Sequence, residues 1–191
     1  MKKNLLISVW FTLATTVLLG IVYPLLVTGL AQLMFPRQAK GELIEEGGKL
    51  VGSHLIGQPF TAPGYFASRP SAAGAAGYDP LASGGSNLGP TNRMLVDRVT
   101  ASVQALQPQN PIVPIPVDLV TTSGSGLDPD ISPASAEFQI PRIARERGMS
   151  EQDVRTLVEK HTRGRQLGFL GEPRVNVLEL NLDLDAVKPI G

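Results

Sequence analysis

The sequence predicts an α+β protein in which a single N-terminal transmembrane helix is followed by one mixed α/β extracytoplasmic domain. Residues 4–36 carry no charged side chain, whereas the charged residues are spread over the remainder of the chain. Helical and strand-like hydrophobic patterns alternate after residue 49, and Gly and Pro cluster between residues 57 and 133. We expect an anchor at 1–36, a polar connector at 37–49 and a soluble α+β domain at 50–191, which is long enough for one core.

The N-terminal stretch is predicted to span a bilayer. A transmembrane helix needs ~20 apolar residues, and the apolar region of a cleaved signal peptide has only ~7–15. Pro24 is expected to bend the helix without ending it. Lys2, Lys3 and the free amine favour a cytoplasmic N-terminus and an extracytoplasmic domain, although Arg37 and Lys40 nearly balance them.

Composition excludes several classes of function. With 17 basic and 17 acidic residues, the chain lacks the basic excess of a general nucleic-acid binder. It has no cysteine, hence no disulfide or thiolate metal site, and its two histidines, His54 and His161, are far apart in sequence. Neither a GxSxG nucleophile motif nor a GxxxxGK[ST] phosphate-binding motif is present. We therefore expect no resident metal or cofactor.

The first half of the domain is predicted to be rich in turns. A strand is expected at 49–56, followed by core aromatics at Tyr65 and Phe66. Leu95, Val99, Val103 and Leu106 recur at helical spacing and predict a helix at 91–106. The proline-rich residues 107–116 indicate an extended connector, and 117–122 a second strand.

The second half is predicted to hold two helices and a strand. Ser132-Pro133 is a typical helix start, Pro141 should kink or shorten that helix, and Gly148 should end it. Ser150-Glu151-Gln152-Asp153 resembles a capping box for a helix that Gly164 would end. Four leucines alternate with polar residues at 175–184, which predicts a strand with a bulge near Val177.

A loop of small residues precedes the first domain helix. Its candidate contact residues for a nucleotide or a partner are Ser83, Gly84, Gly85, Ser86 and Asn87, because small residues expose backbone N–H groups to an anion or a close surface. A plain flexible linker is the alternative.

Other polar residues have a structural and a functional interpretation. Asp128 and Asp130 are positioned to bind a cation or to form turn hydrogen bonds before a helix. His161 on a helix face favours packing or hydrogen bonding. A hydrolase that uses Ser86 or Ser125 as nucleophile would need one of the two histidines as general base.

Several short segments follow one another along nearly the whole chain. They are GSHLIGQ at 52–58, Tyr65-Phe66, Arg69-Pro70-Ser71, SGGSNLGPTN at 83–92, SGSGLDP at 123–129, Ile131-Ser132-Pro133, His161-Thr162, Gly164-Arg165 and LGEPRVNV at 170–177. Together they resemble a known family, the C subunit of the bacterial Kdp potassium-transporting P-type ATPase. Asp130 departs from the family pattern, which often has His there.

The resemblance implies a non-catalytic accessory subunit of a high-affinity potassium uptake complex. Its partners would be a potassium-path A subunit, an ATP-hydrolysing B subunit, the small F subunit and membrane lipid. It would serve assembly and stability and raise the ATP affinity of the B subunit, with ATP bound through the complex. The alternative is a membrane-tethered scaffold or hydrolase domain unrelated to potassium transport. In and beside the matching segments, the expected partner contacts are Asn92, Arg93, Asp128, His161, Arg165, Glu172 and Arg174.

Overall fold

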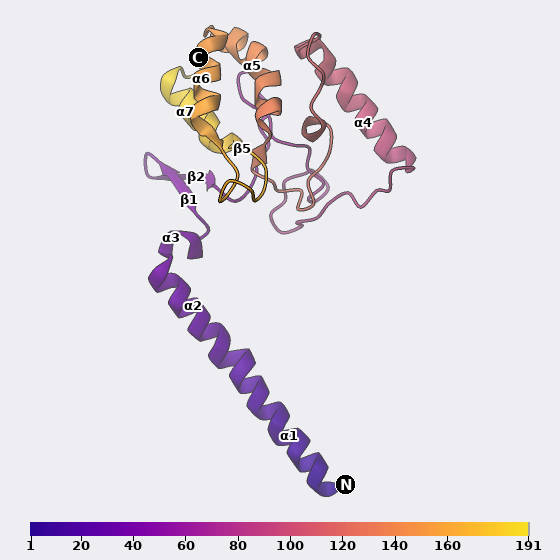
Figure 1. Cartoon of the computed structure of the whole chain (residues 1–191), viewed down its shortest axis with the longest axis vertical. Helices are drawn as coiled ribbons and strands as arrows, with labels where there is room; N and C mark the ends of the chain where they lie inside the picture. Colours follow the sequence, from indigo (N-terminus) through magenta and orange to yellow (C-terminus); the bar gives the residue numbers. More distant parts are fainter. Residues whose placement is uncertain (191) are drawn as a thin grey trace. The chain divides into compact units, whose positions relative to one another are not determined.

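The computed structural model describes residues 1–190 and confirms the predicted fold class (Figure 1). The chain divides into two compact units, Met1–Val51 and Gly52–Gly191. The first holds a long apolar helix and the second a mixed α/β domain.

The N-terminal helix runs without a break from Lys2 to Met34 through α1 (Lys2–Val17), η1 (Leu18–Val22) and α2 (Tyr23–Met34). The middle element is a π-helical turn, in which the Tyr23 N–H bonds to the Leu18 carbonyl. Pro24 lacks an N–H and its ring crowds the preceding turn, so a locally widened helix accommodates it. The helix is long and apolar enough to cross a membrane, and none of its side chains is buried within the chain.

The segment that follows is more ordered than the polar connector predicted from sequence. It forms a short helix, α3 (Pro36–Ala39), and a two-stranded sheet of β1 (Leu43–Glu46) and β2 (Lys49–Ser53). Gly47 and Gly48 both have positive φ in the turn between the strands, a conformation that glycine adopts without strain. The predicted strand at 49–56 is therefore correct only as far as Ser53, whose hydroxyl accepts the Leu55 N–H and turns the chain.

The second unit is built on a small antiparallel sheet with strand order β3-β5-β4. Asp130 lies opposite Asn176, and Thr162 lies opposite Val175. Three helices, α5, α6 and α7, pack around this sheet and one another (Figure 1). Its elements are α4 (Arg93–Leu106), η2 (Gln107–Gln109), η3 (Val117–Leu119), β3 (Asp130–Ile131), α5 (Pro133–Arg147), α6 (Glu151–His161), β4 (Thr162–Arg163), β5 (Arg174–Asn176) and α7 (Val177–Val187).

Capping residues define the helices that were predicted well. The Ser132 hydroxyl accepts the Ser135 N–H at 3.1 Å, and Gly148 ends α5 in the left-handed conformation. Ser150 caps α6 through the Asp153 N–H. Pro141 does not shorten α5, and α6 ends at His161 rather than Gly164 because the chain there joins the sheet as β4.

The helix predicted at 91–106 is α4, which begins after its cap, Asn92. Its four apolar stripe residues are only half-buried, and its main contact is with η2. The connector predicted at 107–116 begins with the 3₁₀ turn η2, so its first part is helical rather than extended.

Two strand predictions were wrong. Residues 117–122 hold the 3₁₀ turn η3 (Val117–Leu119) and irregular backbone after it, and the Asp118 side chain accepts the Ser132 N–H at the start of α5. Residues 177–184 belong to α7, so there is no bulge at Val177, where β5 ends and α7 begins. The Asn176 side chain caps α7 through the Glu179 N–H at 3.1 Å.

An extended segment around Phe66 crosses the core without belonging to a sheet. Phe66 is fully buried and Tyr65 is half-buried. Asn181 of α7 accepts the Phe66 N–H at 2.9 Å and donates to its carbonyl at 3.0 Å. Gln139 of α5 holds the Ala67 N–H and carbonyl in the same way. Helix side chains therefore supply the hydrogen bonds that a neighbouring strand would otherwise provide.

Two buried arginines of α5 hold the residues just before Phe66. Arg142 donates to the carbonyls of Pro63 and Tyr65, and burial lowers the pKa of its guanidinium. The Arg147 side chain is fully buried, donates to the Gly64 carbonyl at 2.7 Å and pairs with Asp185 at 2.8 Å. Position and conformation of this segment thus depend on α5 and α7 together.

Candidate functional site

A cleft of about 610 Å³ lies between η3, β3, the start of α5 and the chain before β5. Its walls combine apolar side chains with two arginines and four carboxylates, so the cleft carries an excess of negative charge. We refer to it as the charged cleft. Its lining residues are Arg69, Pro116, Val117, Asp118, Asp128, Asp130, Ile131, Ser132, Ala134, Glu172, Pro173 and Arg174.

Two ion pairs fix the base of the charged cleft. Arg69 pairs with Asp128 and Arg174 pairs with Asp130, each at 2.9 Å. Asp128 also accepts the Asp130 N–H at 3.1 Å, which is the turn hydrogen bond expected from sequence. Burial raises the pKa of Asp130; the Arg174 charge lowers it and Asp128 raises it further. The charge of Arg174 therefore does not fully offset the cost of burying the Asp130 carboxylate.

Asp118 forms part of the wall and has a structural task. Its carboxylate accepts the Ser132 N–H at 2.8 Å, the Ser132 hydroxyl at 3.1 Å and the Ser135 hydroxyl at 2.5 Å. Burial alone would raise the pKa of Asp118, but the hydrogen bonds from Ser135 and Ser132 outweigh it and hold the pKa below its usual value. Asp118 thus fastens η3 to the start of α5.

These two carboxylates predict opposite effects of amide substitution. Asp118→Asn should lower the free energy of unfolding at pH 7 by about 1–3 kcal/mol, because it weakens charge-assisted hydrogen bonds. Asp130→Asn should leave the free energy of unfolding at pH 7 unchanged or raise it. The pKa of Asp130 is higher in the folded than in the unfolded chain, so at pH values above the unfolded pKa its ionisation opposes folding. Urea unfolding of the full chain in detergent at pH 7 measures both, and equal losses would contradict the assignment.

The small residues of the loop at 83–87 pack against a second Gly/Ser loop at 123–126. The Gly84 N–H and the Ser83 hydroxyl both donate to the Ser125 carbonyl, at 2.8 and 3.1 Å. A Cβ on Gly85 would lie 3.2 Å from the Gly124 carbonyl oxygen. Close backbone contact therefore accounts for Gly85, whereas a Cβ on Gly84 would meet no atom closer than 4.0 Å. A role of the loop at 83–87 in nucleotide or partner binding stays a prediction.

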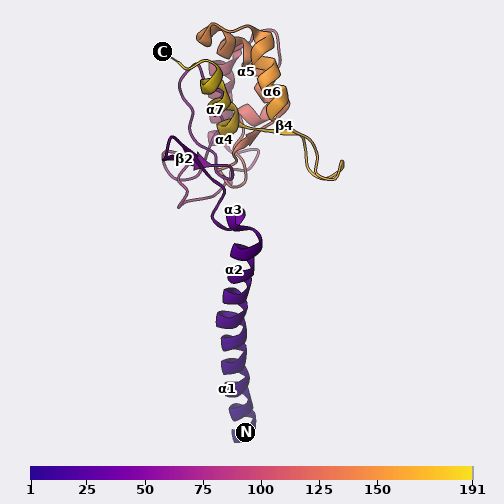
Figure 2. The same ribbon diagram turned by 90° about the vertical axis from the view of Figure 1, so that its left-hand side faces the viewer.

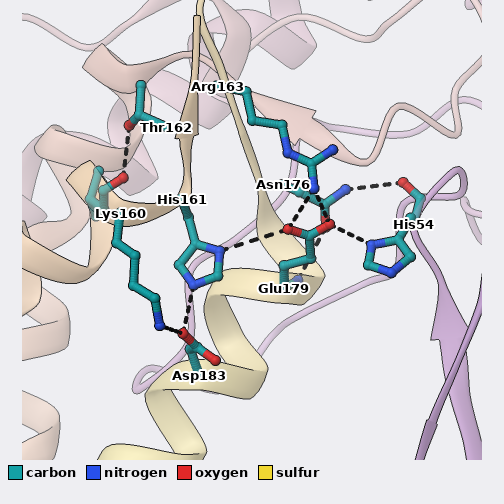
Figure 3. A network of polar contacts seen from close by, with 9 residues as sticks. His54, Lys160, His161, Thr162, Arg163, Asn176, Glu179 and Asp183 are labelled. Carbon is teal, nitrogen blue, oxygen red and sulfur yellow. Dashed lines mark hydrogen bonds and ion pairs between the residues drawn. The ribbon is translucent and has the colours of Figure 1, made fainter.

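A second polar cluster joins the two histidines through α7 (Figure 3). Glu179 contacts His54, accepts Arg163 at 2.7 and 2.9 Å, and lies 3.8 Å from His161 Nδ1. The other His161 nitrogen lies 2.8 Å from Asp183, one helical turn further along α7. Hydrogen bonds from Lys160 and His161 lower the pKa of Asp183. The cluster fastens the chain after β2 and the end of α6 to α7.

Of the residues expected to contact partners, three meet in the charged cleft: Asp128, Glu172 and Arg174. Arg165 is beside it through an ion pair with Glu172 at 2.6 Å. His161 belongs to the second polar cluster, which is joined through α7. Asn92 and Arg93 lie at the start of α4. The Arg93 side chain there is almost fully exposed and lies 3.7 Å from Asp97. No motif in the sequence pointed to Asp118, Glu179 or Asp183 as site residues.

The chain is similar to known proteins over nearly its whole length. A family model described as "KdpC: K+-transporting ATPase, c chain" matches residues 5–186. A Koribacter versatilis protein named as a potassium-transporting ATPase KdpC subunit is 65% identical over 190 residues, which cover 100% of this chain and 98% of the relative. A relative of the same name from Rhodopseudomonas palustris is 53% identical over 199 residues, covering 98% of this chain and 100% of the relative. One from Caulobacter vibrioides is 59% identical over 91% of this chain and 88% of its own length.

Proposed function

The chain belongs to the KdpC family, the c chain of K⁺-transporting ATPases, and from this premise we propose that it is a non-catalytic accessory subunit that assembles and stabilises an ATP-driven potassium uptake complex. The carrying observation is that similarity to the named KdpC subunits extends from one end of the chain to the other, over both the anchor and the domain. The partners would be the potassium-path A subunit, the ATP-hydrolysing B subunit and the small F subunit.

The apolar helix supports a role within a membrane complex. It is uncharged over residues 4–36 and buries none of its side chains within the chain. Lys2 and Lys3 favour a cytoplasmic N-terminus, which would put the domain on the extracytoplasmic side. The domain would then face the outer side of the potassium-path subunit, with the charged cleft and the Gly/Ser loops as contact surfaces.

This orientation constrains how the subunit would raise ATP affinity. ATP is cytoplasmic, so an extracytoplasmic loop at 83–87 has no access to it. Any effect on the B subunit would then be allosteric and would require contacts that differ between two states of the complex.

Topology gives the first test of the proposal. A reporter fused after Gly191 that is active only outside the cytoplasm should be active, and one that is active only inside should be silent. The same two reporters fused after Ala39, beyond the helix, should give the same pattern. A cytoplasmic C-terminus would refute the extracytoplasmic placement and restore direct nucleotide contact.

Co-isolation gives the second test. The tagged full-length chain, extracted in mild detergent from cells that make all the subunits, should bring down the A and B subunits together with potassium-stimulated ATP hydrolysis. The chain isolated alone should show no hydrolysis of ATP. Isolation without any large membrane subunit would favour the unrelated scaffold instead.

A further inference from the structure

A narrow hairpin extends from the sheet of the domain between β4 and β5. It comprises residues 164–173, all of them exposed, and we call it the apolar hairpin (Figure 2). Gln166 and Leu170 exchange two backbone hydrogen bonds, each 2.9 Å long. Arg165 and Glu172 form an ion pair at 2.6 Å across its two arms. The hairpin is therefore an ordered projection rather than an irregular loop.

The tip of the apolar hairpin exposes large apolar side chains. Leu167 is 83% exposed, Phe169 is 69% exposed and Leu170 is 47% exposed. None of them belongs to the buried core cluster of the domain. A contiguous exposed group of this kind is typical of an interaction surface, because its burial by a partner is favourable.

The backbone at the tip is also unfavourable for the residue that occupies it. Leu167 has a φ of +52°, and Gly168 follows with a φ of +82°. Two successive residues of positive φ favour Asn-Gly, and leucine is disfavoured at the first of them. Because Leu167 is almost fully exposed, no packing within the domain compensates for this strain. Strain of this kind is characteristic of functional positions.

We propose that the apolar hairpin is a docking element whose tip, formed by Leu167, Phe169 and Leu170, inserts into an uncharged apolar pocket on the extracytoplasmic surface of another subunit. This inference rests on the proposed function and adds to it the surface through which the domain is held. A few side chains that fill a well-packed, desolvated pocket commonly carry most of the binding energy of an interface.

Charge decides between a protein pocket and a lipid surface. Arg165 is compensated by Glu172, and Arg163 at the base by Glu179 at 2.7 Å. Loops that bind anionic lipid surfaces keep uncompensated Lys and Arg beside their apolar residues. The arms of this hairpin carry internally paired charges, which are complementary to an apolar protein pocket with a neutral rim.

Substitutions at the tip separate docking from folding. Phe169→Ser should weaken retention of the tagged full-length chain by the other subunits about tenfold or more, as for truncation of a central interface aromatic. Leu167→Asn should also weaken it, while leaving the melting temperature of the chain unchanged or raised, because Asn tolerates positive φ. Ile112→Ser is the matched control, since Ile112 is 92% exposed between η2 and η3 and belongs to neither the charged cleft nor the Gly/Ser loops, and should leave retention unchanged.

The outcomes of this test are distinct. If the unsubstituted chain retains no subunit, the proposed function itself fails. If it retains them and Phe169→Ser and Leu167→Asn do so equally well, the hairpin proposal alone is wrong. A photo-crosslinking amino acid in place of Phe169 in the assembled complex should join the chain to another subunit. Crosslinks to lipid only would overturn the choice of a protein pocket.

Discussion

Replacing Asn181 by alanine should lower the free energy of unfolding of the domain by about 2–5 kcal/mol, since each buried backbone group left without a partner costs about 1–3 kcal/mol. Two backbone groups would lose their partner, the N–H and the carbonyl of Phe66, which are both hydrogen-bonded to the Asn181 side-chain amide. Asn181 and Phe66 are both buried, so water cannot replace these bonds without opening the core. Asn181→Leu should be damaging too, because it fills the volume but restores neither bond.

Urea unfolding of the full chain in detergent, followed by circular dichroism, measures this loss. Asn92→Ala is the matched control, because Asn92 also bonds a backbone N–H but caps the exposed start of α4. Loss of such a cap costs about 0.5–2 kcal/mol. If Asn181→Ala destabilised no more than Asn92→Ala, the amide of Asn181 would not be what holds the Phe66 segment.

The sequence was informative wherever a signal is local. Ser132, Ser150 and Gly148 fix helix ends through bonds or conformations within a few residues of themselves, and α5 and α6 were predicted from them. The long apolar helix needs only length and the absence of charge to be recognised. These features do not depend on what the rest of the chain does.

The strand predicted at 175–184 was the principal error, because its hydrophobic pattern fits a strand and a helix alike. Leu178, Leu180, Leu182 and Leu184 alternate with polar residues, as in a half-buried strand. The same residues form a helix, because leucine favours helices and Asn176 provides a cap. As a strand, Glu179, Asn181 and Asp183 would all face outward. In the helix Asn181 is buried, while Glu179 and Asp183 lie one turn apart. Glu179 contacts both histidines and Asp183 contacts His161.

Contacts between distant segments could not be read from the sequence. The charged cleft joins Arg69, Asp118 and Arg174, which are separated along the chain by tens of residues. His54 and His161 likewise share one partner, Glu179 of α7, although they are far apart in sequence. Arg69 and Arg174 both lie in segments that resemble the Kdp family, but their pairing with Asp128 and Asp130 required the fold.

Deleting residues 2–34 should abolish the contribution of this subunit to potassium-stimulated ATP hydrolysis by the assembled complex. A shared membrane raises the effective concentration of the domain beside its partners, and tethering of this kind strengthens association by about 10²–10⁴-fold. The deleted chain should remain in the soluble fraction after membranes are pelleted. The assay compares hydrolysis with and without potassium in membranes that contain the other subunits.

An exchanged helix shows whether the anchor acts beyond tethering. An unrelated apolar helix of the same length in place of residues 2–34 should return the chain to the membrane and restore part of the hydrolysis, because it restores the effective concentration. Full restoration would mean that the native helix contributes only attachment. The exposed Gly20, Thr16 and Thr28 of the native helix predict only partial restoration by the unrelated helix, since small and hydroxylated residues pack between membrane helices. Full hydrolysis by the deleted chain itself would contradict the role of the anchor.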